Sequence, residues 1–165
     1  MEMEDRLQRL EDDRAIRDLK ASYLRAADTK DVEAMRACFT ADAMIAFDGF
    51  PVFTDREAFL SVYRDMACAP GIFDIHHGAN GVVVFDGDGR ATGRWSLLFH
   101  NINLAARSLT QMGVEYDDVY IRGTEGRWRI AETRSRRLSA LVQRVDDSGR
   151  ATVTAMGEMT GDFGG

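Results

Sequence analysis

Apolar residues recur every three or four positions over residues 5–28, and this spacing predicts one amphipathic helix. The adjacent carboxylates Asp12 and Asp13 mark the place where such a helix could break. A second, short helix is predicted over residues 31–39, with Asp31 as its N-cap. The apolar positions of the first helix are Leu7, Leu10, Ile16, Leu19, Tyr23, Ala26 and Ala27.

The next segment mixes two short strands with a third helix. Residues 44–47 and 51–53 are predicted strands around a turn at Gly49. Thr54 and Glu57 have the spacing of a capping box, which predicts a helix that begins there and runs to about residue 67.

After Pro70 and Gly71 the periodicity changes from helical to extended. Strands are predicted over residues 82–85, 91–103, 113–122 and 128–142, with hairpin turns at 86–89 and 124–127. Three helices followed by long antiparallel strands predict an α+β fold. A curved mixed or antiparallel sheet wrapped around about three N-terminal helices would form a cone-shaped barrel with a pocket.

We expect residues 1–145 to form a single domain and residues 146–165 to form a glycine-rich tail. This tail has three open interpretations: it extends the last hairpin, covers the pocket mouth, or is disordered.

Composition and charge narrow the class of protein. A chain of 165 residues with 45% hydrophobic and 29% charged residues is typical of one soluble domain. The net charge of −6 argues against nucleic-acid binding.

No apolar run approaches the length of ~18 residues that a membrane span needs. The acidic N-terminus lacks the apolar stretch of a signal peptide, so we expect a cytoplasmic protein. The cysteines Cys38 and Cys68 lack metal-ligand spacing, so no metal site is expected.

The most informative polar residues are Asp28, at the end of the first helix, and His76, at the start of an apolar segment. A carboxylate that orients an imidazole makes it a general base, which suggests a buried Asp28–His76 pair. His76 and His77 are adjacent, so in a strand only one of them faces the pocket. The alternative interpretation places Asp28 in a solvated turn and the histidines on the surface.

The chain contains no glycine-rich dinucleotide motif, P-loop or nucleophile elbow, so proton transfer without a cofactor is the simplest chemistry available to it. Large apolar side chains are candidates to line the substrate pocket, although ordinary core packing is the alternative for each. They are Phe47, Phe53, Trp95, Phe99, Met112 and Tyr116.

Four segments resemble the SnoaL-like group of the nuclear-transport-factor-2-like superfamily over about residues 8–140. They are Ile16–Asp28, Cys38–Ala43, His76–Asp88 and Gly126–Glu132. Within this group the spacing is most similar to scytalone dehydratase, bile-acid 7α-dehydratase and hexachlorocyclohexane dehydrochlorinase. Those enzymes use an Asp–His dyad to remove a proton from carbon while a leaving group departs.

The resemblance assigns roles to individual positions. Asp28 matches the family aspartate, and His76 matches the family histidine, four residues before Asn80. Tyr23 stands where the bile-acid enzyme has a catalytic tyrosine, and His100 stands near a second histidine of scytalone dehydratase.

The chain also departs from scytalone dehydratase in ways that argue against scytalone as the substrate. Phe47 and Ala27 stand where that enzyme has tyrosines. Asp117 stands roughly where it has an asparagine, so we count Asp117 as a further candidate for substrate binding.

We therefore expect a cofactor-independent, dehydratase-like lyase for a small hydrophobic, cyclic or aromatic substrate. The alternatives are a non-catalytic ligand-binding protein, a small (β) subunit of an aromatic ring-hydroxylating dioxygenase, and a polyketide cyclase or isomerase. Apolar residues on the long strands suggest a homodimer or homotrimer that buries the convex sheet face. They are Val119, Ile121, Ile130 and Leu138.

Overall fold

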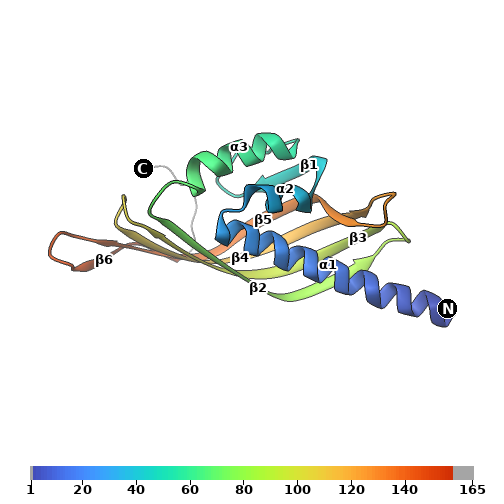
Figure 1. The fold of residues 1–165 in the computed structure, drawn as a ribbon. Coiled ribbons are helices and arrows are strands. Elements are labelled where there is room, and N and C mark those ends of the chain that lie inside the picture. The colour runs from blue at the N-terminus through green and yellow to red at the C-terminus, as the bar shows by residue number, and fades with distance from the viewer. Residues whose placement is uncertain (1, 158–165) are drawn as a thin grey trace.

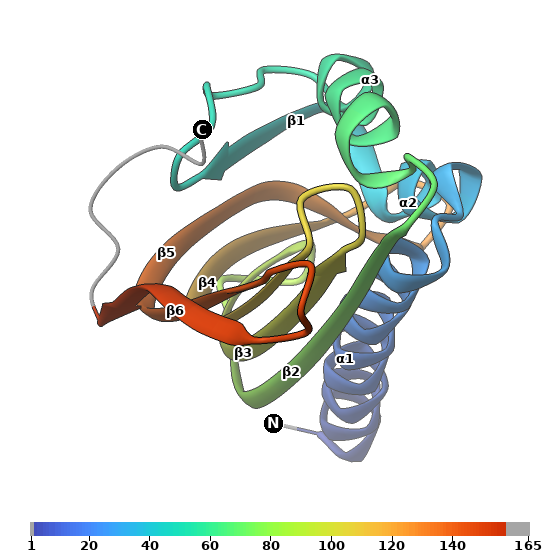
Figure 2. The ribbon, with the colours of Figure 1, turned by 90° about the vertical axis from the view of Figure 1, so that its left-hand side faces the viewer.

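Three helices lie against one side of a curved sheet in the computed structural model, which describes residues 2–157 (Figures 1 and 2). The helices are α1 (Met3–Thr29), α2 (Val32–Cys38) and α3 (Arg56–Ala67). The strands are β1 (Phe39–Phe47), β2 (Ile72–Phe85), β3 (Arg90–Asn103), β4 (Ser108–Arg122), β5 (Trp128–Val145) and β6 (Ala151–Gly157).

The strands form one mixed sheet in the order β1-β5-β4-β3-β2, and β6 pairs with β5. All neighbouring pairs are antiparallel except β1 and β5, which are parallel. The sheet is strongly curved, with α3 packed beside β1 at one edge and α1 packed beside β2 at the other (Figure 2). This arrangement confirms the predicted cone-shaped α+β fold.

Helix α1 is continuous through Asp12 and Asp13, so the possible break there does not occur. The two carboxylates have partners that are compatible with a helix. Asp12 accepts a hydrogen bond of 2.8 Å from Nε1 of Trp128, and Asp13 pairs with Arg17 at 2.6 Å one turn later.

The other two helices begin at aspartate N-caps. Asp31 accepts a hydrogen bond of 2.9 Å from the backbone N–H of Ala34, as predicted. At α3 the N-cap is Asp55, which accepts a bond of 2.8 Å from the backbone N–H of Ala58. The cap therefore lies one residue after Thr54, and the predicted capping box of Thr54 and Glu57 is wrong, because Ala58 stands at the third helical position.

The short strands differ from their predicted bounds. β1 begins at Phe39, and the segment 51–53 contributes only an isolated bridge from Phe53 to Ile45. β2 is much longer than the predicted strand over 82–85. A register shift between Ala79 and Val82, with Asn80 at a φ of 52°, reverses the alternation of inward and outward side chains. The sequence therefore shows no continuous alternating pattern across β2, and its first half was not predicted.

Of the three interpretations of the tail, extension of the last hairpin is confirmed for residues 151–157, which form β6. Residues 158–165 lie outside the described part of the chain. The prediction that the tail covers the pocket mouth concerns these residues and stays a prediction.

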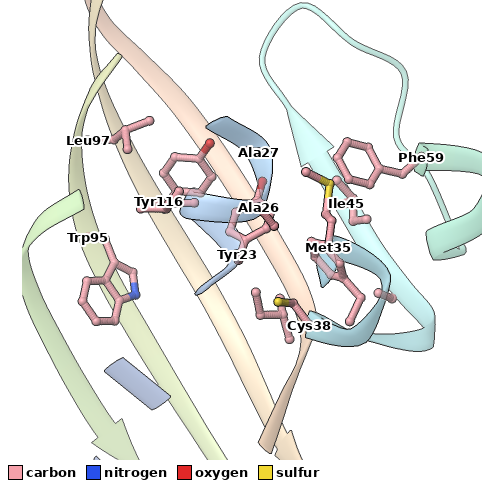
Figure 3. Packing of buried hydrophobic residues seen from close by; sticks show 14 of the residues in the cluster. Tyr23, Ala26, Ala27, Met35, Cys38, Ile45, Phe59, Trp95, Leu97 and Tyr116 are labelled. Atoms are coloured by element: carbon pink, nitrogen blue, oxygen red, sulfur yellow. The ribbon is translucent and has the colours of Figure 1, made fainter. Parts of the chain in front are cut away.

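The hydrophobic core lies between the helices and the sheet, where side chains such as Met35, Ile45 and Phe59 meet (Figure 3). Ile130 is fully buried in this core, so its predicted place on the convex face is wrong. Leu138 does lie exposed on that face, together with Phe73, Ile75 and Leu98. Within residues 2–157, no helix combines the length and apolarity that crossing a bilayer requires.

Candidate active site

A cavity of about 590 Å³ opens between the helices and the concave face of the sheet. Its wall contains residues of all three helices and of strands β1 to β5, so distant parts of the chain meet there. A volume of this size is typical of small-molecule sites.

Asp28 reaches this region because of the way α1 ends. The helix terminates at Thr29, and Lys30 adopts a left-handed conformation with a φ of 59°, so Asp28 lies in the last turn. The helix also packs closely on β2, since a Cβ atom at Gly78 would lie 2.7 Å from Cδ1 of Leu24. This close approach brings the Asp28 carboxylate within reach of β2.

Asp28 and His76 form the predicted pair. Oδ1 of Asp28 lies 2.6 Å from Nδ1 of His76 and also accepts the backbone N–H of His76 at 3.0 Å. A carboxylate only accepts hydrogen bonds, so in the neutral form of the imidazole the proton belongs on Nδ1 and Nε2 carries the lone pair. The His76 ring, packed 4.8 Å from the ring of Phe99, lines the cavity. A carboxylate that holds an imidazole in this way is the arrangement that general-base chemistry requires.

Strand alternation separates the two adjacent histidines. Asp74 and His76 line the cavity, whereas His77 is exposed on the other face of β2. Of the two histidines, His76 is therefore the one that faces the cavity.

Tyr23 of α1 and Tyr116 of β4 both line the cavity, and they lie near each other in Figure 3. Burial raises the pKa of both phenols, and the Asp118 carboxylate adds to the rise in each. Both hydroxyls are therefore protonated at neutral pH. Each phenol therefore has a hydroxyl proton that it can donate.

Three candidates lie elsewhere, and the structure corrects their predicted positions. Phe99 and Asn101 line the cavity, so His100 between them points to the outer face of the sheet. Asp117 is also on that face, exposed and paired with Arg94 at 3.0 Å. Trp95 points inward but lies beyond the cavity wall, where its Nε1 donates to the hydroxyl of Tyr120 at 2.9 Å.

The remaining apolar candidates do line the cavity: Phe47, Phe53, Phe99, Met112 and Tyr116. Several of them are also part of the core, because Phe47 packs edge-on against Phe59 and Tyr116. These side chains therefore pack in the core and line the cavity at the same time, so the two interpretations do not exclude each other.

The sequence analysis missed a second polar group on the cavity wall. Asp74, whose side chain is only 7% exposed, accepts a hydrogen bond of 2.6 Å from Nδ2 of Asn101 and pairs with Lys30. The signal was strand alternation, since Asp74 lies two residues before His76 and Asn101 two residues after Phe99. Arg137 and Arg144 of β5 also line the cavity.

A second missed group lies fully buried behind the tyrosine pair. Nζ of Lys20 lies 2.7 Å from Oδ2 of Asp118 and 3.9 Å from the ring centroid of Tyr116. Asp118 also accepts hydrogen bonds of 2.7 Å from Tyr120 and from Thr133. Burial lowers the pKa of Lys20, and the neighbouring Asp118 carboxylate opposes that shift.

No cluster of three or more His, Cys, Asp or Glu side chains within residues 2–157 is arranged to hold a metal ion.

Comparison with known proteins identifies relatives of this architecture. The model of the SnoaL-like domain matches residues 8–134. No curated protein matches the chain.

Among solved structures, a scytalone-dehydratase-like protein from Novosphingobium aromaticivorans has a TM-score of 0.74 at 19% identity, covering 81% of this chain and 88% of its own. Hexachlorocyclohexane dehydrochlorinase LinA-type3 from Novosphingobium barchaimii has a TM-score of 0.72 at 20% identity, covering 90% and 94%. A protein of unknown function from Mycobacterium tuberculosis has a TM-score of 0.68 at 29% identity, covering 83% and 76%.

Proposed function

Because the chain belongs to the SnoaL-like family, we propose that it is a cofactor-independent, dehydratase-like lyase acting on a small hydrophobic, cyclic substrate. The observation that carries the proposal is the distance of 2.6 Å between Asp28 and His76 at the wall of a cavity. The structural resemblance to a dehydratase-like protein and to a dehydrochlorinase supports a lyase, although at their identities it establishes only the fold.

In the proposed reaction, Nε2 of His76 removes a proton from the carbon next to a substrate carbonyl. The electron pair of that C–H bond becomes a carbon–carbon double bond as the β-hydroxyl group departs. The proton held by His76 then passes to the departing oxygen, so the products are an unsaturated ketone and water. Asp28 keeps the imidazole oriented and stabilises its protonated form.

The tyrosine pair supplies the second element of the mechanism. As negative charge develops on the substrate carbonyl oxygen, the hydroxyl of Tyr23 or Tyr116 donates a hydrogen bond to it. A preorganised donor of this kind contributes about 10²–10³-fold to the rate. His100 has no part in this mechanism, because its side chain faces away from the cavity.

The proposal predicts that the wild-type protein dehydrates 3-hydroxy-1-tetralone to 1-naphthol and water. This probe has an acidic C–H bond beside its carbonyl and a hydroxyl on the next carbon. Formation of 1-naphthol is followed by absorbance, against a buffer control that measures spontaneous loss of water. We expect saturable kinetics and loss of activity in Asp28→Asn.

Other outcomes would favour the alternatives. A probe that binds without changing would indicate a ligand-binding protein, and co-purification with a large iron-bearing chain would indicate a dioxygenase small subunit. A cyclase or isomerase would still remove the C–H proton but would form no 1-naphthol.

We also propose that the chain forms a homodimer or homotrimer through the convex sheet face. The support is its exposed apolar side chains, among them Phe73, which is 56% exposed, and Leu98, which is 59% exposed.

A further inference from the structure

A buried ion pair lies behind the two tyrosines of the cavity wall. Lys20 of α1 and Asp118 of β4 pair at 2.7 Å, and both side chains are buried. Lys20 precedes Tyr23 by about one turn on the inner face of α1. Asp118 follows Tyr116 by two residues, so both point to the same side of β4. The ion pair therefore adjoins both tyrosines from the side opposite the cavity.

The positive end of this ion pair faces the aromatic rings. Nζ of Lys20 lies 3.9 Å from the ring centroid of Tyr116 and 5.3 Å from that of Tyr23. At such distances a cation is attracted to the electron density of a ring. The ammonium group therefore lies where it favours negative charge on either phenol and on an anion bound to its hydroxyl.

The negative end is held in place by other donors. Oδ2 of Asp118 accepts a hydrogen bond from the Tyr120 hydroxyl, and Oδ1 accepts one from Thr133, each of 2.7 Å. The Tyr120 hydroxyl accepts a bond of 2.9 Å from Nε1 of Trp95. Gly93 leaves the space for this contact, because a Cβ atom there would lie 2.8 Å from the Tyr120 ring and 2.9 Å from Nε1 of Trp95. The carboxylate is thus fixed on both oxygens.

Stability alone does not explain why two charges occupy this place. Apolar side chains of similar volume often stabilise a core as well as a buried ion pair does, because taking charges out of water is unfavourable. The pair of Lys20 and Asp118 supplies something that apolar residues cannot, which is a fixed charge distribution beside two hydroxyl donors. Fixed charges of this kind are most effective where charge develops during a reaction.

The charge of Asp118 on its own would oppose an anion at the tyrosines. It contributes to the raised pKa of the Tyr23 phenol and of the Tyr116 phenol, so its field reaches both hydroxyls. The same repulsion would act on a negatively charged oxygen that accepts a hydrogen bond from them. The ammonium group of Lys20 counteracts this repulsion, because it carries the opposite charge and contacts the same rings.

We propose that Lys20 is a positioning residue, whose charge offsets that of Asp118 and thereby allows Tyr23 and Tyr116 to bind an oxyanion in the cavity. Lys20 does not line the cavity, so it acts through the tyrosines and not on the substrate itself. The inference rests on the proposed function, in which the oxyanion is the enolate oxygen of the substrate, and it assigns a role to the ion pair behind it.

The test measures the binding of an oxyanion without any turnover. 4-Nitrophenol is ionised in mildly alkaline buffer, and its phenolate oxygen resembles that of an enolate. 4-Nitroaniline is a neutral molecule of nearly the same size and shape. Calorimetry with the full-length protein gives the affinity for each probe. We expect Tyr23→Phe/Tyr116→Phe to weaken phenolate binding by about tenfold or more, because hydrogen bonds to charged groups are strong.

The two halves of the ion pair should differ in their effects. Lys20→Met should weaken phenolate binding by about tenfold and leave 4-nitroaniline within about twofold, because an unpaired Asp118 charge repels only the anion. Asp118→Asn should not weaken phenolate binding, because it removes the repelling charge while the amide oxygen still accepts a hydrogen bond. A purely structural ion pair predicts instead that both variants, which break the same contact, weaken both probes.

A double variant covers the case in which Lys20→Met is too unstable to study. Lys20→Met/Asp118→Asn contains neither charge and should bind the phenolate within about threefold of wild type, because the repulsion and its counterpart are both removed. Circular dichroism at the assay temperature verifies that each variant is folded. A tenfold loss of phenolate binding in this double variant or in Asp118→Asn would contradict the proposal.

The control is Arg94→Met, which breaks the exposed ion pair with Asp117 on the outer face of the sheet. It should leave both affinities unchanged. The proposal is overturned if Lys20→Met weakens both probes alike, if it weakens neither, or if the wild-type protein binds neither probe. Failure of the dehydration assay with Lys20-dependent phenolate binding would count against the lyase and in favour of this role of Lys20. Normal dehydration with phenolate binding that does not depend on Lys20 would do the reverse.

Discussion

Replacing His76 with glutamine should lower the rate of dehydration of 3-hydroxy-1-tetralone by about 10²–10⁴-fold, because a positioned general base contributes that much. Glutamine preserves most of the side-chain volume against Phe99 but cannot take up a proton. Asp28→Asn should produce a loss of similar size, since an amide does not stabilise the imidazolium and can favour the wrong tautomer. The measurement is kcat with each purified variant.

The matched control is the adjacent His77→Gln, which makes the same change on the exposed face of β2. It should retain kcat within about twofold of wild type, because surface changes away from a site have small effects. Equal losses in His76→Gln and His77→Gln would contradict the assignment of the base. Thermal unfolding of all three variants separates loss of chemistry from loss of fold.

The largest effect on stability is expected at the buried pair of Lys20 and Asp118. Lys20→Met should lower the free energy of unfolding by about 3–5 kcal/mol, because it leaves the Asp118 carboxylate buried without its cation. The double variant Lys20→Met/Asp118→Leu should be more stable than Lys20→Met, since it removes the unpaired charge as well. Urea denaturation monitored by circular dichroism measures all of these values.

The control is the exposed ion pair formed by Asp117, which is the residue next to Asp118 in the chain. Arg94 and Asp117 pair at 3.0 Å with side chains that are 70% and 63% exposed. Arg94→Met should cost only about 0–1 kcal/mol, as is typical of surface pairs. If Lys20→Met costs no more than Arg94→Met, the buried network is not important for stability.

Helix positions and long strands were predictable because their apolar periodicity is regular. The bounds of α1 and β3 differ from their predictions by two residues or fewer at each end. The first half of β2 was not predicted, because its register shift reverses the phase of alternation. The interval 51–53 was overestimated as a strand because a single bridge leaves the same short apolar signature as a paired strand.

The dyad was predictable because Asp28 and His76 each adjoin an apolar segment and match a family spacing. His100 and Asp117 were misplaced because similarity of position along the chain does not determine which face of a strand a residue occupies. Strand phase would have excluded both.

The apolar periodicity of α1 and β4 also indicated the buried ion pair of Lys20 and Asp118. Lys20 lies on the apolar face of α1, between Ile16 and Tyr23, and Asp118 follows the inward series of Val114 and Tyr116. A charged residue at a predicted core position indicates a buried partner, but only the fold identifies that partner.

The most direct test of the proposed base is exchange of the C2 protons of 1-tetralone with deuterium from D₂O, followed by mass spectrometry. This measurement reports proton removal from carbon and needs no leaving group. We predict that wild-type protein accelerates exchange over buffer and that His76→Gln loses this acceleration, whereas His77→Gln keeps it. Exchange at the buffer rate with wild-type protein, or undiminished exchange with His76→Gln, would contradict the account.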